Sequence, residues 1–347
     1  MVKNEADIIE SFIRYHAAIV DEMVVVNHFS SDRTVEILEK LVREGLPVRI
    51  SHAKEVEWNQ SQVTTRLAYQ AIEEWGADLV LPLDADEFLV AADGSVNPRM
   101  LLDQLEERAL HIILWRNYFP HASDNPREPV IPRRLVYRVD DGVEQRGKTM
   151  LFKSMAQECS PAISMGGHGL VMSRRSRKRF PQRIASALRM AHFPVRSIHQ
   201  IISKIYVSHL TLLSRYDAKL AQGIHVQKLY AELKKGGSVD VEDMQRMVAD
   251  AYLVGSPRQF KLIKDPLTAP FLPSLELRYT AADEINILHN VLECSEDLAV
   301  KYAKLKKDEH SVSKTAALFV KTLGGYLWQT ILRTFLGNKR EVDSYHP

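Results

Sequence analysis

Short apolar strands and amphipathic helices alternate along the first half of the chain, and this alternation constrains the fold more than any other feature. Residues 23–27, MVVVN, are a β-branched run typical of a buried strand. The segments between such runs repeat their apolar residues at helical spacing. Strands that alternate with helices in this way predict a parallel sheet covered by helices on both faces. The expected strands are 23–27, 48–50, 79–83 and 111–119, and the expected helices are 5–19, 33–45, 60–75 and 99–109.

The pattern changes after about residue 133. Three short strand candidates, 133–139, 148–154 and 168–173, are separated by glycine-containing turns, and the chain after Arg196 is mostly helical in pattern. With 347 residues the chain is long enough for one large domain or two moderate ones. We therefore predict an α/β domain over residues 1–195 and a largely helical C-terminal region over residues 196–347.

Composition disfavours several classes of protein. The formal net charge of +2 gives no support to a nucleic-acid partner. The two cysteines, Cys159 and Cys294, argue against a disulfide framework and a cysteine metal site, and favour a reducing compartment. The start, VKNEAD, has no apolar signal segment, and no run of about 18 apolar residues could span a membrane. We therefore expect a cytoplasmic protein.

Three acids interrupt an apolar run in LVLPLDADEFLV, residues 79–90. They stand where a strand of a parallel sheet would end, which is the edge at which such sheets bind ligands. Side chains alternate along an extended chain, so Asp84 and Asp86 are expected on one side, where their repulsion is relieved by a cation. Carboxylate oxygens suit Mg²⁺ or Mn²⁺, which bridge to substrate phosphates. A surface turn with capping acids is the alternative, but it does not explain the apolar residues Phe88–Val90.

Other proteins with an Asp-x-Asp motif fit less well. Phosphatases that form an aspartyl phosphate carry Asp-x-Asp-x-Thr/Val on an early strand, whereas the fifth position here is Phe88. The chain has neither a G-x-G-x-x-G nor a G-x-x-x-x-G-K-S/T phosphate loop. We therefore expect phosphate to be held by a metal ion and basic side chains.

Several segments together resemble a known family. VKNEADIIESFIRYH, VNHFSSDRT, LPLDADEFL, WRNYF, GGHG and HFPVRS are similar to segments of the family-2-type glycosyltransferases of the GT-A fold, in particular the bacterial branch with an Asp-Ala-Asp-Glu-Phe metal motif. The resemblance covers roughly the first 200 residues. It implies a GT-A, Rossmann-like sheet and transfer of a sugar from a nucleoside-diphosphate donor, with a UDP-sugar favoured, Mn²⁺ or Mg²⁺ on the diphosphate and inversion at the anomeric carbon. The expected acceptor is a cell-envelope or exported glycan, or a lipid-linked one.

The resemblance also assigns roles to individual residues. Asp86 would be the direct metal ligand, Asp84 would contact the ribose or the metal, and the catalytic Glu87 would orient the neighbouring loop. His168 and His192 are candidates for a late metal or diphosphate contact. The remaining donor-binding candidates are Asn4, Glu5, Asn27, Asp32, Lys148 and Arg196.

An acceptor hydroxyl needs a base within hydrogen-bond reach. The candidates are Asp124, Asp141 and Glu144, all in polar loops. We favour Asp124 because it follows the strand after the metal motif. Each of the three also fits a solvated loop acid, and the sequence does not choose among them.

The C-terminal segment 317–337 repeats apolar residues every four positions, as in Phe319, Leu323 and Leu327. An interfacial membrane helix has this pattern, and so does a helix docked on the catalytic domain. The paired glycines Gly324 and Gly325, which weaken a free helix, favour docking. The interfacial alternative would fit a lipid-linked acceptor and peripheral contact with the inner face of the membrane.

Two departures from the family pattern keep other functions open. Relatives carry a full strand before the Lys-Asn-Glu element, whereas Met1 stands directly at its end, and many relatives have an acid where this chain has Asn27. A degenerate transferase domain that binds a glycan or a partner without catalysis is therefore one alternative. A nucleotidyltransferase is the other, although it would need a basic, glycine-rich triphosphate loop near the start.

Overall fold

The computed structural model describes residues 1–54, 59–142, 146–172, 180–213, 224–235, 239–253, 260–281, 285–302 and 304–305. Two compact units divide the chain, Met1–Ser295 and Glu296–Pro347. Of the second unit, the described residues 296–302 and 304–305 are helical. The predicted amphipathic segment 317–337 and the base candidate Glu144 lie outside the described residues.

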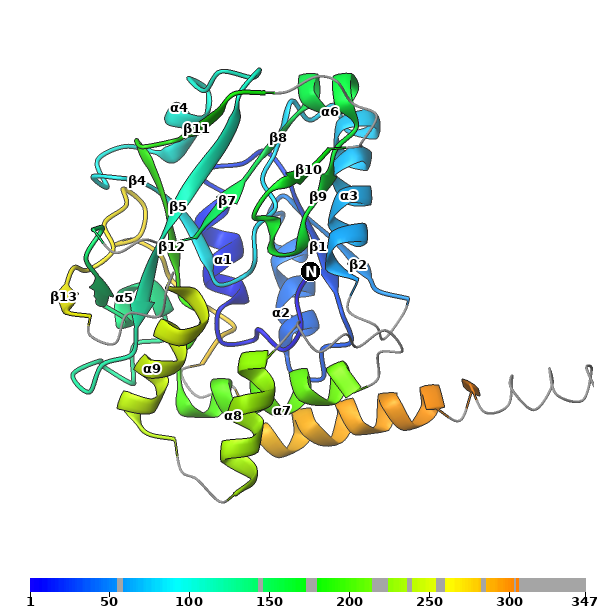
Figure 1. Cartoon of the computed structure of the whole chain (residues 1–347), viewed down its shortest axis with the longest axis vertical. Coiled ribbons are helices and arrows are strands. Elements are labelled where there is room, and N and C mark those ends of the chain that lie inside the picture. Colours follow the sequence, from blue (N-terminus) through cyan, green and yellow to red (C-terminus); the bar gives the residue numbers. More distant parts are fainter. Residues whose placement is uncertain are drawn as a thin grey trace, which may run out of the picture. The chain divides into compact units, whose positions relative to one another are not determined.

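The N-terminal part of the first unit begins with two helices and two paired strands (Figure 1). β1 (Met23–Asn27) and β2 (Val48–His52) are parallel, with Val25 opposite Ile50. Val2 adds a parallel bridge to Asn27, so the N-terminal residues lie beside β1. α2 (Thr34–Arg43) is amphipathic, because its apolar residues recur every three or four positions and are buried on one face. α1 (Ile9–His16) is buried on nearly all sides, and Arg14 is its one residue that is not fully buried.

β5 (Leu110–Phe119) is the centre of the largest sheet, whose strand order is β13–β6–β5–β12–β4. β12 (Leu188–His192) runs parallel to β5 and antiparallel to β4 (Glu87–Ala91). β6 (Tyr137–Val139) and β7 (Gly147–Thr149) are antiparallel to β5, and β11 (Gln182–Ile184) is parallel to it. β13 (Leu262–Lys264) pairs antiparallel with β6.

The fold is therefore α/β, as predicted, but the sheet is mixed rather than mostly parallel. Among the described strands, six of the nine pairings are antiparallel. Most of the antiparallel pairings join segments that are far apart in the sequence, such as β12 with β4, β13 with β6 and β3 with β8. The alternation of strands and helices in the first half of the chain therefore does not reveal them.

Two further pairs of strands lie outside the largest sheet. β3 (Leu79–Val80) pairs antiparallel with β8 (Leu151–Phe152), and β9 (Ala162–Ile163) with β10 (Leu170–Val171). α3 (Gln60–Glu74) lies against β9, because the Ser61 hydroxyl donates a hydrogen bond of 2.6 Å to the Ile163 carbonyl. The short helices are α4 (Pro98–Leu102), α5 (Ile131–Arg134), α6 (Lys153–Cys159) and the 3₁₀ turn η1 (Met165–Gly167).

Three helices lie between β12 and β13 in the chain, and Figure 1 shows them close together below the sheet. They are α7 (Ile198–Leu213), α8 (Ile224–Lys234) and α9 (Val241–Tyr252). Ile205 and Val248 of these helices share an apolar core with Phe119 and Val139 of the sheet. We predicted a boundary near Arg196, but the helices belong to the same compact unit as the sheet, and Arg196 itself is fully buried.

The predicted helices and strands agree with the structure to different degrees. The strands expected at 23–27, 48–50 and 111–119 are confirmed as β1, β2 and β5, whereas the expected strand 79–83 contains only Leu79 and Val80. The helix expected at 99–109 ends at Leu102. No helix in the described part of the chain has both the length and the apolar character needed to cross a bilayer.

Candidate functional site

Asp84 and Asp86 lie in a tight turn between β3 and β4, and Glu87 is the first residue of β4. The backbone N–H of Glu87 donates to the Asp84 carbonyl at 3.1 Å and closes the turn. The Glu87 side chain folds back and accepts a hydrogen bond of 2.9 Å from the Asp84 backbone N–H. Because the chain turns here instead of continuing as an extended strand, Asp84 and Asp86 contact different groups, unlike our prediction that they would share one side.

Asp84 and Glu87 share the buried cation Lys148. The Lys148 ammonium lies 2.7 Å from an Asp84 oxygen and 2.8 Å from a Glu87 oxygen, and its side chain is 2% exposed. Gln60, at the start of α3, donates to the other Asp84 oxygen at 2.8 Å. The indole N–H of Trp115 donates to the second Glu87 oxygen at 2.9 Å. These hydrogen bonds fix the turn against β5, α3 and the β7 strand.

The charges of this group are strongly coupled. Burial acts to raise the pKa of Asp84, but the Lys148 ammonium lowers it, and the resulting pKa is about 2. Burial raises the pKa of Glu87 to about 8, although Lys148 opposes the shift. Burial acts to lower the pKa of Lys148, and the two carboxyl groups raise it above its usual value. Lys148 therefore stays charged at neutral pH and neutralises the Asp84 carboxylate.

Asp86 is bound differently. Its side chain is 9% exposed, and its backbone carbonyl accepts a hydrogen bond of 2.8 Å from the Phe193 N–H. Three nitrogens surround the carboxylate at longer range: His192 Nε2 and Arg196 Nη1 at 3.8 Å, and Lys204 Nζ at 3.6 Å. Among the described residues none of these contacts is a hydrogen bond, so the carboxylate oxygens of Asp86 keep lone pairs for a ligand.

His192 ends β12 with its ring held on three sides. Its Nδ1 lies 2.7 Å from the Asn117 side-chain oxygen, and its ring stacks on Trp115 with centroids 4.4 Å apart. The ring of Tyr252 meets it edge-on at 4.8 Å. Burial lowers the pKa of His192 to about 4, so the ring is neutral at pH 7. Because an amide oxygen only accepts, Nδ1 carries the hydrogen and Nε2 presents its lone pair toward Asp86.

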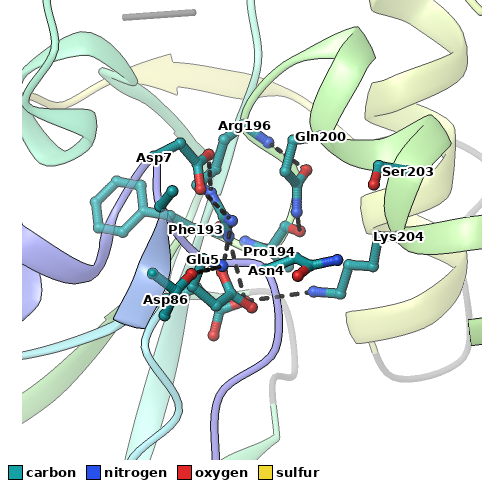
Figure 2. Close-up of polar contacts among 12 residues, drawn as sticks. Asn4, Glu5, Asp7, Asp86, Phe193, Pro194, Arg196, Gln200, Ser203 and Lys204 are labelled. Carbon is teal, nitrogen blue, oxygen red and sulfur yellow. Dashed lines mark hydrogen bonds and ion pairs between the residues drawn. The ribbon is translucent and has the colours of Figure 1, made fainter. Parts of the chain in front are cut away.

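Arg196 joins the N-terminal segment to the start of α7 (Figure 2). Its guanidinium donates to both carboxylate oxygens of Asp7, at 2.7 and 2.8 Å, and to Glu5 at 2.6 Å. Burial raises the pKa of Glu5 to about 7, and Arg196 opposes that shift. Arg196 thus forms buried ion pairs with Asp7 and Glu5, and its predicted contact with a diphosphate stays a prediction.

Lys204 of α7 also reaches the acids. Its side chain is 38% exposed, and its only described carboxylate contact is the one with Asp86 at 3.6 Å. Burial acts to lower the pKa of Lys204, but Tyr252 and Asp86 raise it, so the ammonium is charged at neutral pH.

Taken together, five carboxyl groups surround three cations. The carboxyl groups are those of Glu5, Asp7, Asp84, Asp86 and Glu87, and the cations are Lys148, Arg196 and Lys204. Because burial raises the pKa of Glu87 to about 8, Glu87 is mostly protonated at neutral pH, and the other four acids then face the three cations. The cluster keeps a small excess of negative charge when these four are ionised, and a bound cation would be attracted to it.

Asp86 and His192 are the residues best placed to hold such an ion, because the carboxylate has unused lone pairs and the imidazole is neutral. Within the described residues, no group of three or more His, Cys, Asp or Glu side chains is close enough to form a complete metal site. Mg²⁺ and Mn²⁺ are commonly held by one or two carboxylates and completed by water and substrate phosphates. The arrangement therefore fits an ion that is completed by an anionic ligand.

The other donor-binding candidates organise the loop after β1. Asn4 is left-handed (φ 56°) and its side-chain oxygen accepts a hydrogen bond of 2.8 Å from the Ser31 N–H. Asp32 accepts from the Ala6 N–H at 3.0 Å and the Thr34 N–H at 2.9 Å, and burial raises its pKa. Asn27 accepts from the Ser30 N–H at 3.1 Å. These contacts attach the loop to the N-terminal segment, and nucleotide binding by these residues stays a prediction.

His168, like His192, contacts the ring of Trp115. Its Nδ1 contacts the Gly147 carbonyl at 2.9 Å, its ring is 5.0 Å from Trp115, and burial lowers its pKa. No described contact joins His168 to Asp86. Gly167, with φ 65°, allows the chain to pass close to Pro82, since a Cβ there would lie 3.1 Å from the proline.

The base candidates lie in the loops after β5 and β6. One Asp124 oxygen accepts a hydrogen bond of 2.7 Å from the His121 N–H, and burial raises the pKa of Asp124. Its other oxygen is buried and has no hydrogen-bond partner among the described residues. Asp141 forms ion pairs with Arg116 at 2.7 Å and Arg138 at 2.8 Å, which is typical of a structural acid. Neither acid has a described contact with the acid turn.

Several residues of the site escaped the sequence analysis. Lys204 is the only lysine or arginine in α7, and a single cation in an otherwise uncharged helix was the available signal. Asn117 lies in the quoted WRNYF segment but was given no role there, and nothing in the local sequence marks Gln60 or Tyr252. Asp7 lies two residues after Glu5, and this proximity was the only indication.

Comparisons with known proteins give no family for the chain. No family model matches it. A comparison with curated proteins finds no significant match either.

Proposed function

We propose that the protein is a metal-dependent glycosyltransferase, which moves a sugar from a nucleoside-diphosphate sugar to a cell-envelope or exported glycan. The observation that carries the proposal is the facing pair of Asp86 and His192. The buried Asp86 carboxylate, which has no hydrogen bond among the described residues, lies 3.8 Å from a neutral imidazole whose tautomer is fixed by Asn117. Together with the resemblance of the DADEF segment to the GT-A transferases, this pair supports a divalent metal that binds a diphosphate.

The residues around the turn would have different roles in such a site. A bound Mn²⁺ or Mg²⁺ would neutralise the charge that develops on the leaving diphosphate. Asp86 and His192 would hold the ion, and Asn117 keeps His192 in its ligating tautomer. Lys148, Gln60 and Trp115 hold Asp84 and Glu87 in place, which keeps the turn in one geometry. Preorganised groups of this kind avoid rearrangement during the reaction.

In this proposal Asp124 is the base that takes the proton from the acceptor hydroxyl. A base for the acceptor hydroxyl needs an oxygen that is not already bound and a pKa that is not too low. Asp124 has one buried oxygen without a described partner and a raised pKa, both of which suit the role. A UDP-sugar remains the favoured donor, a lipid-linked glycan a candidate acceptor, and the cytoplasm, with peripheral contact at the membrane, the proposed location.

A thermal-unfolding screen tests the function directly. The protein is heated with UDP-, GDP-, CMP- and dTDP-sugars, with and without Mn²⁺, beside Asp86→Asn and the exposed-acid control Asp103→Asn. A ligand that binds only the folded state raises the unfolding temperature. We expect a rise that needs both Mn²⁺ and one nucleotide, that persists in Asp103→Asn and that is lost in Asp86→Asn. No rise with any donor, in a protein that unfolds cooperatively, would contradict the proposal.

A non-catalytic binding domain is the second candidate. The observation in its favour is that Lys148 and Arg196, which we predicted to contact the diphosphate, are both engaged in short contacts with acids. Such a domain would bind a donor without cleaving it. Release of free nucleoside diphosphate from a bound donor, measured with and without Mn²⁺, separates the two functions.

A further inference from the structure

The three cations near the acids, Lys148, Arg196 and Lys204, differ in how closely carboxyl groups already contact them. Lys148 is 2% exposed and contacts two carboxyl groups within 2.8 Å. Arg196 is 0% exposed and donates to Asp7 and Glu5 within 2.8 Å. Lys204 is 38% exposed, and its described contact with a carboxylate is at 3.6 Å, longer than a hydrogen bond. Lys204 is therefore the cation of this cluster that is most available to an incoming anion.

Helix α7 packs on the sheet around Lys204, whose own side chain stays partly exposed. Ile201 and Ile205, on either side of it, are buried in the second apolar core. The preceding residue, Ser203, accepts a hydrogen bond of 3.0 Å from Asn290, which also accepts one of 3.2 Å from Ser31. Because Ser31 binds Asn4 in turn, a chain of hydrogen bonds connects α7 with the N-terminal residues of the site.

Asn4 supplies a second polar group that an anion could contact. Its side-chain oxygen is bound by Ser31, but its side-chain nitrogen is buried with no hydrogen-bond partner among the described residues. A buried donor of this kind is unfavourable unless a ligand accepts from it. Figure 2 shows Asn4 among the residues around Lys204 and Asp86. An anion bound near Asp86 would have both an ammonium and an amide donor available.

We propose that Lys204 is the residue that contacts the donor diphosphate, and that it serves as the counterion of Asp86 when no metal is bound. This inference rests on the proposed function and adds to it a residue from the helical region. Two consequences of opposite sign follow. Removing the ammonium should weaken diphosphate binding, because a charge-assisted hydrogen bond is lost. It should also strengthen metal binding, because a like charge 3.6 Å from the Asp86 oxygen is removed.

The test uses Lys204→Gln, Lys204→Arg and a matched control, Lys153→Gln. Lys153 resembles Lys204 in exposure, at 40%, and in having one long carboxylate contact, 3.7 Å from Asp78, but it lies on α6. Free Mn²⁺ is measured by electron paramagnetic resonance, and binding of UDP, GDP, CDP and dTDP is measured by calorimetry at saturating Mn²⁺. The corresponding nucleosides are measured in parallel, because they lack the diphosphate.

For Lys204→Gln we expect diphosphate affinity to fall about 10- to 100-fold, nucleoside affinity to stay unchanged and Mn²⁺ affinity to rise. Lys204→Arg should keep most of the diphosphate affinity, and Lys153→Gln should match the wild type in all three measurements. Wild-type binding of Mn²⁺ and a nucleoside diphosphate that Lys204→Gln leaves unchanged would overturn the role of Lys204 alone. Failure of the wild-type protein to bind either would overturn the proposed function and this role with it.

Discussion

The side-chain oxygen of Asn117 lies 2.7 Å from Nδ1 of His192, and this contact joins two neighbouring strands at the site. The residues are register partners of the parallel strands β5 and β12. Both are buried, so no water competes for the hydrogen bond. The result is that one imidazole nitrogen is fixed as a donor and the other, Nε2, is left as an acceptor toward Asp86. A ligand of a metal ion needs this tautomer.

Asn117 would not contact the metal itself. Asn117→Ala should still reduce metal affinity, because His192 loses the group that orients it. We expect Mn²⁺ affinity to fall about 10- to 100-fold, the usual effect of removing a group that orients a metal ligand. Asn117→Asp restores an acceptor for Nδ1–H and should recover most of the affinity. Mn²⁺ binding is measured by electron paramagnetic resonance on variants whose circular dichroism shows a native fold. Equal affinities for wild type and folded Asn117→Ala would show that the contact has no bearing on metal binding.

The two histidines beside Trp115 should differ sharply when replaced. His192 faces Asp86 and is buried, whereas His168 is exposed and contacts the Gly147 carbonyl. We expect His192→Gln to lower Mn²⁺ affinity by at least as much as Asn117→Ala, and His168→Gln to change it less than about twofold. The same titration measures both. A comparable loss in the two variants would restore His168 as a metal ligand.

Local sequence was sufficient to predict the strands and helices whose own residues favour that conformation. β1, β2 and β5 contain β-branched and aromatic residues between turn residues, and α2 and α3 have regular apolar spacing. β12 was not predicted, because LRMAH contains no β-branched residue. It becomes a strand because β4 and β5 supply hydrogen-bond partners on both of its sides. The mixed strand directions of the sheet were not predicted for the same reason, because they depend on contacts between distant segments.

The candidate site was predictable only where a motif carried it. The acids at 84–87 and His192 belong to quoted segments of the family resemblance, and the structure brings Asp86 and His192 together. Lys204 reaches the same carboxylate from a helix that we placed in a separate region. Its contribution depends on how α7 packs on the sheet, and packing of this kind cannot be read from periodicity or propensity.

The buried histidine His16 should make stability depend on pH. Its Nδ1 contacts the Phe12 carbonyl at 2.9 Å and its Nε2 accepts from the Leu89 N–H at 3.3 Å, so the fold requires the neutral ring. Burial lowers the pKa of His16 to about 4, from 6.5 in the unfolded chain. As the pH falls below 6.5 the unfolded chain takes up the proton first, so stability is lost between pH 6.5 and 4. The full loss is about 3 kcal/mol for this one group.

The measurement is the slope of the unfolding free energy against pH for wild type and His16→Gln, from urea titrations at pH 7, 6 and 5. Glu5 and Glu87 act in the opposite direction, because burial raises the pKa of each and the folded state then takes up their protons first. Both proteins contain Glu5 and Glu87, so the contribution of these acids cancels when one slope is subtracted from the other. We expect the loss of stability on acidification to be smaller in His16→Gln. Parallel slopes would show that His16 is not held neutral by the fold.

Glu10 should contribute more to stability than any sequence pattern suggests. It is fully buried in α1, and its two oxygens accept hydrogen bonds of 2.8 Å from the backbone N–H groups of Arg278, Tyr279 and Thr280. Arg14 donates a fourth at 2.9 Å. The carboxylate thus attaches a segment some 270 residues away to the first helix. An amide has one acceptor oxygen and would turn a donor N–H₂ group toward these donors.

Glu10→Gln should therefore lower the free energy of unfolding by about 2–3 kcal/mol, because at least one buried N–H group loses its acceptor. Glu39→Gln makes the same chemical change at an exposed position of α2 and should alter stability by less than about 0.5 kcal/mol. Chemical denaturation gives both values, and limited proteolysis reports whether residues 276–281 become accessible. If Glu10→Gln is as stable as Glu39→Gln and the segment stays protected, the carboxylate is not the group that holds it.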